Sequence, residues 1–117
     1  MNRVIVFAVM DSLRELSDIA YQQRVWLASS GPEIASFTEA VCHLFNDSGL
    51  GDALEKSGVS FSMETDSRLR LLRSMLSKID SRRAPSDIIA EPRMQQVRVL
   101  AKALLGEIQR SEAVPGT

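Results

Sequence analysis

The chain has few of the residues on which proteins build covalent or metal chemistry. It contains one cysteine and one histidine, Cys42 and His43, in 117 residues. A single cysteine cannot form an internal disulfide, and a zinc site needs four protein ligands, or three and a water molecule. We therefore expect no disulfide and no metal site, and a reducing, cytoplasmic location.

Long apolar runs and an excess of one charge are also missing. The apolar run Val4–Met10 has seven residues and is followed by Asp11, so it is far shorter than the roughly eighteen residues of a membrane span. Fourteen basic and fifteen acidic side chains give a net charge of −1. This balance argues against a nucleic-acid coat and against a polybasic membrane binder. We expect neither nucleic acid nor a membrane as a partner.

The familiar catalytic signatures are absent from the sequence. It has no P-loop, no dinucleotide-binding glycine pattern, no nucleophile elbow and no H-E-x-x-H motif. Cys42 and His43 are adjacent, so on a helix their side chains point about 100° apart. We interpret Cys42 as a small core residue and His43 as a partly exposed helix residue. The sequence thus predicts a protein that is not an enzyme and holds no cofactor.

What the chain does contain is the composition of one ordinary globular domain. Apolar residues make up 44% and charged residues 25%, as in typical folded proteins. A chain of this length buries about two-thirds of its surface on folding, which is enough for a core. We expect a single helical domain over residues 1–111 and a flexible tail over 112–117.

Apolar residues recur at helical spacing through most of the chain. The pattern predicts an all-α fold, a single-domain bundle of four to six helices with short links. We expect these residues to be mainly buried: Ile5, Val9, Leu13, Leu16, Trp26, Phe37, Val41, Leu44, Phe45, Leu69, Leu72, Leu76, Ile79, Val97, Ala101, Leu104 and Ile108.

Capping and turn residues predict several helix ends. Ser17 is a candidate cap for a second helical segment, and Ser30 with Pro32 predicts the start of a third. The turn sequence at 46–49 predicts the end of that third helix, and Pro92 predicts the start of the last one.

Three stretches are less regular. Residues 4–16 fit a helix, although the β-branched residues at 4–6 also fit a buried strand. Alternation at 59–63 allows a short strand. Residues 82–85 are predicted to be a connector.

Charge is distributed unevenly along the chain. Residues 1–60 hold eight acidic and four basic side chains, whereas 61–117 hold seven acidic and ten basic ones. If the first two helical segments are continuous, Asp11, Glu15 and Asp18 share a face. That face is either simply solvated or a binding surface, because complementary charge speeds encounter and sets orientation. We predict that a basic protein partner is contacted by Asp11, Glu15, Asp18, Asp47, Asp52 and Glu55.

The basic residues of the second half have acidic neighbours at helical spacing. Arg68 follows Glu64 by four residues, and Arg70 follows Asp66 by four. Such pairs are side by side on a helix, so we expect part of this positive charge to be neutralised locally.

The hexapeptide at 21–26, YQQRVW, holds the only tyrosine and the only tryptophan. Together with FTEAVCHLFND at 37–47 and E-P at 91–92, it resembles a family of small, largely uncharacterised bacterial all-helical proteins with a Y-Q-x-R-V-W element. The resemblance covers residues 13 to about 105 and implies no catalytic residue; Asn46 stands where the family pattern has an aspartate. In size and isolation such proteins are similar to immunity proteins encoded beside bacterial toxins.

Three functions follow from these features, in decreasing order of support. The first is a non-enzymatic binding protein of the immunity type, which neutralises a cognate toxin by covering its active site. The alternative is a helical homodimer with a structural or regulatory role, in which apolar faces of the last two helices self-associate. The third is an enzyme of unknown type, which needs a pocket with perturbed titratable groups. Trp26 is interpreted as a core residue, with an interface position as the alternative.

Overall fold

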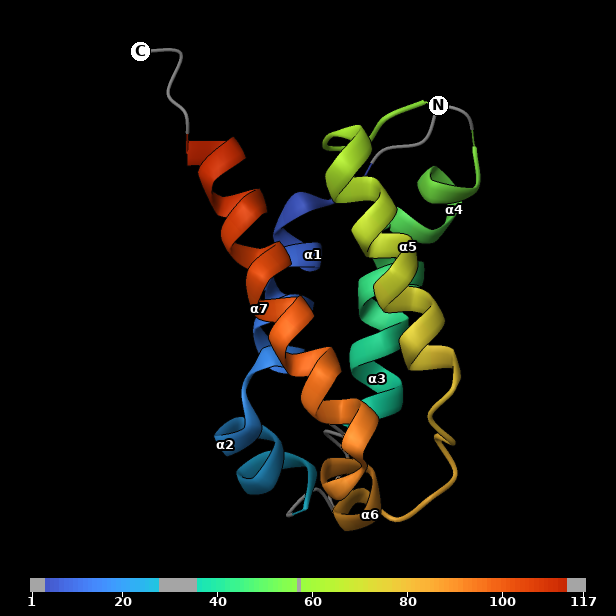
Figure 1. The fold of residues 1–117 in the computed structure, drawn as a ribbon, viewed down its shortest axis with the longest axis vertical. Helices are drawn as coiled ribbons and strands as arrows, with labels where there is room; N and C mark the ends of the chain where they lie inside the picture. The colour runs from blue at the N-terminus through green and yellow to red at the C-terminus, as the bar shows by residue number, and fades with distance from the viewer. Residues whose placement is uncertain (1–3, 28–35, 57, 114–117) are drawn as a thin grey trace.

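The computed structural model describes residues 4–27, 36–56 and 58–113, and within these ranges it confirms the all-α class. They form seven helices, five of at least seven residues, and no strand (Figure 1). The segments are α1 (Val6–Ser17), α2 (Ile19–Tyr21) continued by the π-helical η1 (Gln22–Trp26), α3 (Phe37–Cys42) continued by the π-helical η2 (His43–Asp47), α4 (Leu50–Glu55), α5 (Met63–Ser77), α6 (Pro85–Ala90) and α7 (Pro92–Ala113). The short helix α6 takes the number above the predicted four to six.

Helix α7, the longest, packs against both α1 and α5 (Figure 1). Helix α1 also packs against α3 and η2, and α6 joins η1 to the start of α7. The core between these helices is apolar: Leu13, Leu72 and Leu104 are fully buried, and Trp26 meets Phe37 edge-on with ring centroids 6.1 Å apart.

The predicted core is confirmed except at Ile5 and Val41. Every other predicted core residue is buried. The prediction for Ile5 is wrong, since 53% of its surface is exposed. Ile5 precedes α1 in extended conformation, and its N–H donates to the Ser48 carbonyl at 2.8 Å. Val41 is only partly buried, since it lines a surface groove between α3 and α5.

The first two helical segments are separate, and the break lies one residue beyond the predicted cap. Asp18, not Ser17, is the cap: its backbone is extended, and its carboxylate accepts from the Tyr21 N–H at 3.0 Å. The Gln22 side chain closes the end of α1 by donating to the carbonyls of Glu15 and Leu16, at 2.9 and 3.0 Å. Residues 4 and 5 form no strand, so the helical interpretation of 4–16 holds from Val6 onward.

Two other predicted segments differ from the structure. Residues 59–63 form no strand; Ser62 caps α5 by accepting from the Thr65 N–H at 3.0 Å. The connector predicted at 82–85 ends in a helix, because Pro85 occupies the first turn of α6. Ile88 and Ile89 of this helix are buried.

The remaining predicted ends are placed as follows. The predicted start at Ser30 and Pro32 lies outside the described residues, and Ser36 caps α3. The turn after η2 is present, with Gly49 in left-handed conformation at φ 81°. Pro92 begins α7 as predicted, and α7 continues to Ala113; residues 114–117 lie outside the described part.

The basic residues of α5 do not pair within the helix as predicted. Arg68 forms an ion pair with Glu107 of α7, and Arg70 donates to the Leu54 carbonyl at 2.9 Å. Asp66 is buried and accepts from the N–H groups of Ser60 and Phe61, at 2.7 and 3.0 Å. These charges therefore join α5 to neighbouring segments. No helix in the described ranges is both long and apolar enough to cross a lipid bilayer.

Candidate functional site

A groove of about 390 Å³ lies where α1, α2 and η2 meet. We call it the acidic groove, and it is lined by Asp11, Arg14, Glu15, Asp18, Tyr21 and His43. Three of the six predicted partner-binding residues lie in it, those of α1 and its C-terminal end. Its three carboxylates outnumber its one guanidinium, so the groove is rich in negative charge.

Glu15 is the most constrained acid of the acidic groove. Its carboxylate is half buried and accepts a hydrogen bond from Trp26 Nε1 at 3.0 Å. Burial raises the pKa of Glu15, and the Trp26 hydrogen bond opposes that rise. Trp26 itself is only 2% exposed, which makes it a core residue whose polar edge fixes an acid at the surface.

The other two acids of the acidic groove have different local roles. Asp11 forms an exposed ion pair with Arg14 at 3.1 Å, one turn along the same helix. Asp18 caps α2 through its hydrogen bond with the Tyr21 N–H. The condition for the predicted acidic face, one continuous helix through the first two segments, is not met, because α1 ends at Ser17. Asp11 and Glu15 lie one turn apart on α1 and Asp18 follows at its C-cap, so the three acids still line the groove together.

Tyr21 forms the aromatic part of the groove wall. Burial, together with the nearby Glu15 carboxylate, raises the pKa of the Tyr21 hydroxyl. The Arg24 guanidinium lies over its ring, 5.8 Å from the centroid.

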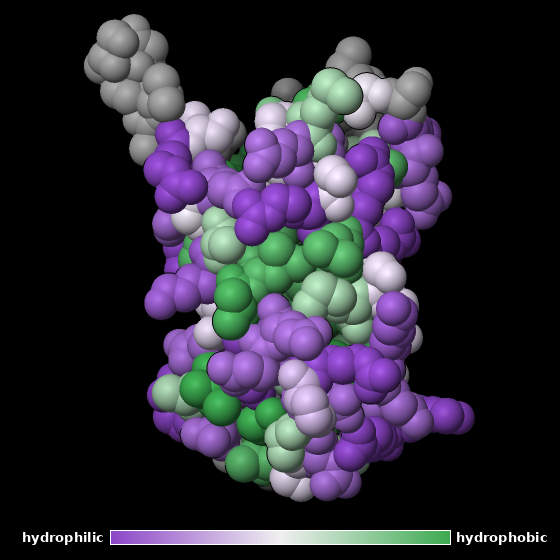
Figure 2. All heavy atoms as spheres, viewed as in Figure 1, coloured by the Kyte–Doolittle hydropathy of each residue, from purple (hydrophilic) through white to green (hydrophobic). Residues whose placement is uncertain are grey.

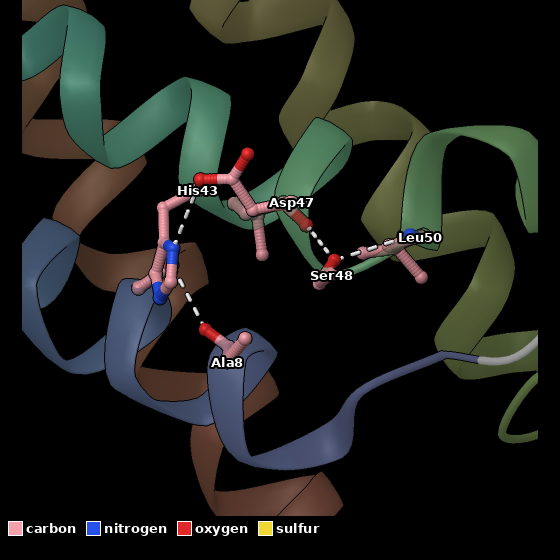
Figure 3. A network of polar contacts seen from close by, with 7 residues as sticks. Ala8, His43, Asp47, Ser48 and Leu50 are labelled. Atoms are coloured by element: carbon pink, nitrogen blue, oxygen red, sulfur yellow. Dashed lines mark hydrogen bonds and ion pairs between the residues drawn. The ribbon is translucent and has the colours of Figure 1, made fainter.

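His43 closes the acidic groove from the side of η2. Its Nδ1 lies 3.3 Å from Asp47 Oδ2, one turn further along the chain. Figure 3 shows the ring directed from η2 toward Ala8 of α1. Asp47 therefore lies beside the groove, behind the histidine, and extends its negative charge.

Ser48 fixes the position of η2 relative to α1. Its hydroxyl donates to the Leu44 carbonyl and accepts from the Leu50 N–H at 3.1 Å (Figure 3). Its own carbonyl accepts from the Ile5 N–H. The hydroxyl links the end of η2 to the start of α4, and the carbonyl holds the residue before α1. The position of His43 in the groove wall is therefore fixed relative to α1.

The second predicted acidic group does not join the acidic groove. Asp52 is exposed in the first turn of α4, and Glu55 pairs with Arg73 of α5 at 3.1 Å. Arg73 in turn lies over the Phe45 ring, 5.4 Å from its centroid. Of that group, only Asp47 lies against a residue of the groove.

Behind the groove lies a buried polar cluster that sequence reasoning missed. Arg98 of α7 is 8% exposed and donates to Gln22 Oε1 at 3.0 Å and to the Ile89 carbonyl at 2.7 Å. Burial lowers the pKa of Arg98. Because Gln22 also caps α1, the cluster ties the end of α1 to the junction of α6 and α7. Gln22 and Arg98 are 76 residues apart in the sequence, so no local sequence pattern predicts their contact.

The groove has the chemistry of a surface for cations. Carboxylates at different depths and an aromatic ring suit an ammonium or guanidinium group. Within the described ranges, no three His, Cys, Asp or Glu side chains are grouped so as to hold a metal ion.

Comparisons with known proteins identify no relative. No family model, no curated protein and no solved structure matches the chain at a significant level. What is shown is a small all-helical protein, and the likeness to the Y-Q-x-R-V-W family stays a prediction.

Proposed function

We propose that the protein is a non-enzymatic binding module for a basic protein, which it holds over the acidic groove. The observation that carries this proposal is the Glu15 carboxylate, half buried and fixed by Trp26 between Asp11 and Asp18. A carboxylate that has lost part of its hydration gains more from a cation than an exposed one does. A lysine or arginine of the partner, inserted beside Tyr21, supplies that cation.

The specific role we propose is that of an immunity-type protein, which neutralises a toxin by covering its active site. A toxin that acts on nucleic acid has a basic active site built to hold phosphates, and a groove rich in carboxylates is complementary to it. Asp47 adds negative charge beside the groove. The absence of catalytic motifs from the sequence agrees with a protein that acts by binding.

The test removes the charge of the groove while keeping its hydrogen bonds. In Asp11→Asn/Glu15→Gln/Asp18→Asn, the amides still accept from Trp26 and from the Tyr21 N–H, so the fold is retained. The matched control Glu55→Gln/Asp80→Asn/Asp87→Asn makes the same charge change at exposed positions outside the groove. Wild type, groove variant and control are each used to capture proteins from the source organism, and mass spectrometry quantifies what each of them binds. Calorimetry then measures how tightly each binds the most abundant basic protein captured by wild type.

We expect the groove variant to bind this partner at least about tenfold more weakly, with a smaller salt dependence, and the control to bind like wild type. Equal affinity and equal salt dependence for groove variant and wild type contradict the acidic groove as the contact surface. Co-expression tests the immunity role separately: the wild-type protein restores growth of cells that express the captured partner, and the groove variant does not. A captured partner that is harmless to cells contradicts immunity but not binding.

A further inference from the structure

A second groove differs from the acidic groove in the residues that line it. Between α5 and α7 runs a groove of about 370 Å³ with largely apolar walls. Leu71 and Val99 are 53% and 63% exposed there, beside the partly buried Met75 and Leu100. Figure 2 shows apolar residues gathered over α5 and α7 at the centre of this side. We call these four residues the apolar face; contiguous patches of this kind mark interaction sites on soluble proteins.

The apolar face carries almost no charge of its own. The other residues that line its groove are Gln95, Gln96, Ala103 and Arg68. Arg68 forms an ion pair with Glu107 of α7, so its charge is balanced within the chain. A basic or acidic partner would therefore gain little here, whereas two copies of this face can meet without repulsion.

The charges that do flank the apolar face are arranged along α5 with opposite signs at its two ends. Glu64 is exposed in the first turn of α5, and Lys78 is exposed at its C-cap. Neither is ion-paired with another of the described residues. Leu71 lies seven residues from each, about 10 Å along the helix in either direction.

We propose that a second copy of this chain covers the apolar face, with α5 antiparallel to α5 of that copy. A two-fold axis near Leu71 then places Glu64 of each copy opposite Lys78 of the other, so that two ion pairs flank an apolar centre. This inference does not rest on the proposed function, because none of its residues lines the acidic groove.

The other two-fold arrangement of the same face is disfavoured by charge. In that arrangement α5 of one copy packs on α7 of the other, and the α5 helices of the two copies run parallel. Within the chain, the start of α5 lies beside Glu107, to which Thr65 donates at 3.0 Å. That arrangement therefore brings Glu64 toward Glu107 of the second copy, and Lys78 toward the end of α7 that holds Arg93. Like charges then lie opposite each other at both ends of the face.

The first experiment measures self-association of the full chain by sedimentation equilibrium at concentrations up to about 1 mM, with far-UV circular dichroism as the folding check. We expect a dimer, and at least about tenfold weaker association for Val99→Glu, which places two buried carboxylates in the interface. The matched control Ile19→Glu changes an exposed isoleucine of α2 and leaves association unchanged. A monomer throughout this range, or a dimer that Val99→Glu leaves intact, overturns the proposal.

The second experiment tests the orientation through the flanking charges. Glu64→Lys and Lys78→Glu are each expected to weaken the dimer roughly three- to tenfold, and the double variant Glu64→Lys/Lys78→Glu to restore it. Both positions are exposed, so these variants fold. Tighter association of Glu64→Lys indicates the contact with Glu107 and overturns the antiparallel arrangement, as does a double variant weaker than either single one.

Discussion

The acidic groove and the apolar face, on different helices of one small bundle, expose opposite kinds of surface. In the groove each of the three carboxylates has a local partner: Glu15 has Trp26, Asp11 has Arg14, and Asp18 has the Tyr21 N–H. On the apolar face, Leu71 and Val99 have no such partner and remain more than half exposed. An exposed acid is already stabilised by water, whereas an exposed leucine is not, so the second surface gains more from being covered.

The comparison also shows how misleading charge spacing is by itself. The acids of the first sixty residues were expected to act together, yet Glu55 is neutralised by Arg73 and Asp52 lies outside the groove. By contrast, Leu71 attracts no notice in the sequence, because it sits beside the core residue Leu72 in a leucine-rich helix.

The largest effect is expected inside α5, where the adjacent residues Leu71 and Leu72 face opposite environments. Leu72 is fully buried, so Leu72→Ala should lower the free energy of unfolding by about 2–5 kcal/mol. The matched control Leu71→Ala removes the same atoms from an exposed position and should cost less than about 1 kcal/mol in the monomer. Urea unfolding at a concentration below dimer formation measures both. Equal losses would show that the two residues are equally buried.

A smaller effect is expected behind the acidic groove, where Gln22 and Gln23 differ in the same way. Gln22 is fully buried, and Gln22→Ala removes its hydrogen bonds to Arg98 and to the last carbonyls of α1, at a cost of about 1–3 kcal/mol. Gln23 is exposed, and Gln23→Ala should change stability by less than about 0.5 kcal/mol. Thermal unfolding of the two variants measures the difference. If Gln22→Ala is as stable as Gln23→Ala, the buried cluster does not hold the groove in place.

The smallest effect is expected in the acidic groove itself, as a pH dependence. The pKa of Glu15 is raised in the folded protein, so folding favours its protonated form. The stability that Glu15 contributes is therefore full below its unfolded pKa and is lost as pH rises through the higher folded pKa. Glu15→Gln, which cannot titrate, should lack this part of the stability–pH curve. Carboxyl NMR titration should place the Glu15 pKa above the ordinary value for a glutamate; a value at or below the ordinary one contradicts the burial argument.

Periodicity predicted the long elements well, because each spans enough turns to repeat its pattern. The stripe from Leu69 to Ile79 and the one from Val97 to Ile108 are buried as expected. Helix α6 was missed because six residues, less than two turns, repeat the pattern too few times to be recognised. The predicted strand at 59–63 failed for a related reason: alternation over five residues does not make a strand without a neighbour to pair with.

The candidate site was predicted only in part, and the missing part is non-local. Asp11, Glu15 and Asp18 were chosen for their spacing on one helix, and they do share a groove, although α1 ends at Ser17 and Asp18 is its C-cap. Tyr21 and His43 come from other elements. Their place in the groove depends on how α2 and η2 pack against α1, which no local pattern encodes.

The sequence by itself therefore determined the helical class, most of the core and the start of α7, because these depend on local spacing and on residues such as Pro92. The tertiary structure decided the rest. It alone brought Trp26 to Glu15, Gln22 to Arg98 and Leu71 beside Val99. The physical reason is that a helix presents a whole cylinder of side chains, and only packing against its neighbours decides which of them become buried, paired or exposed.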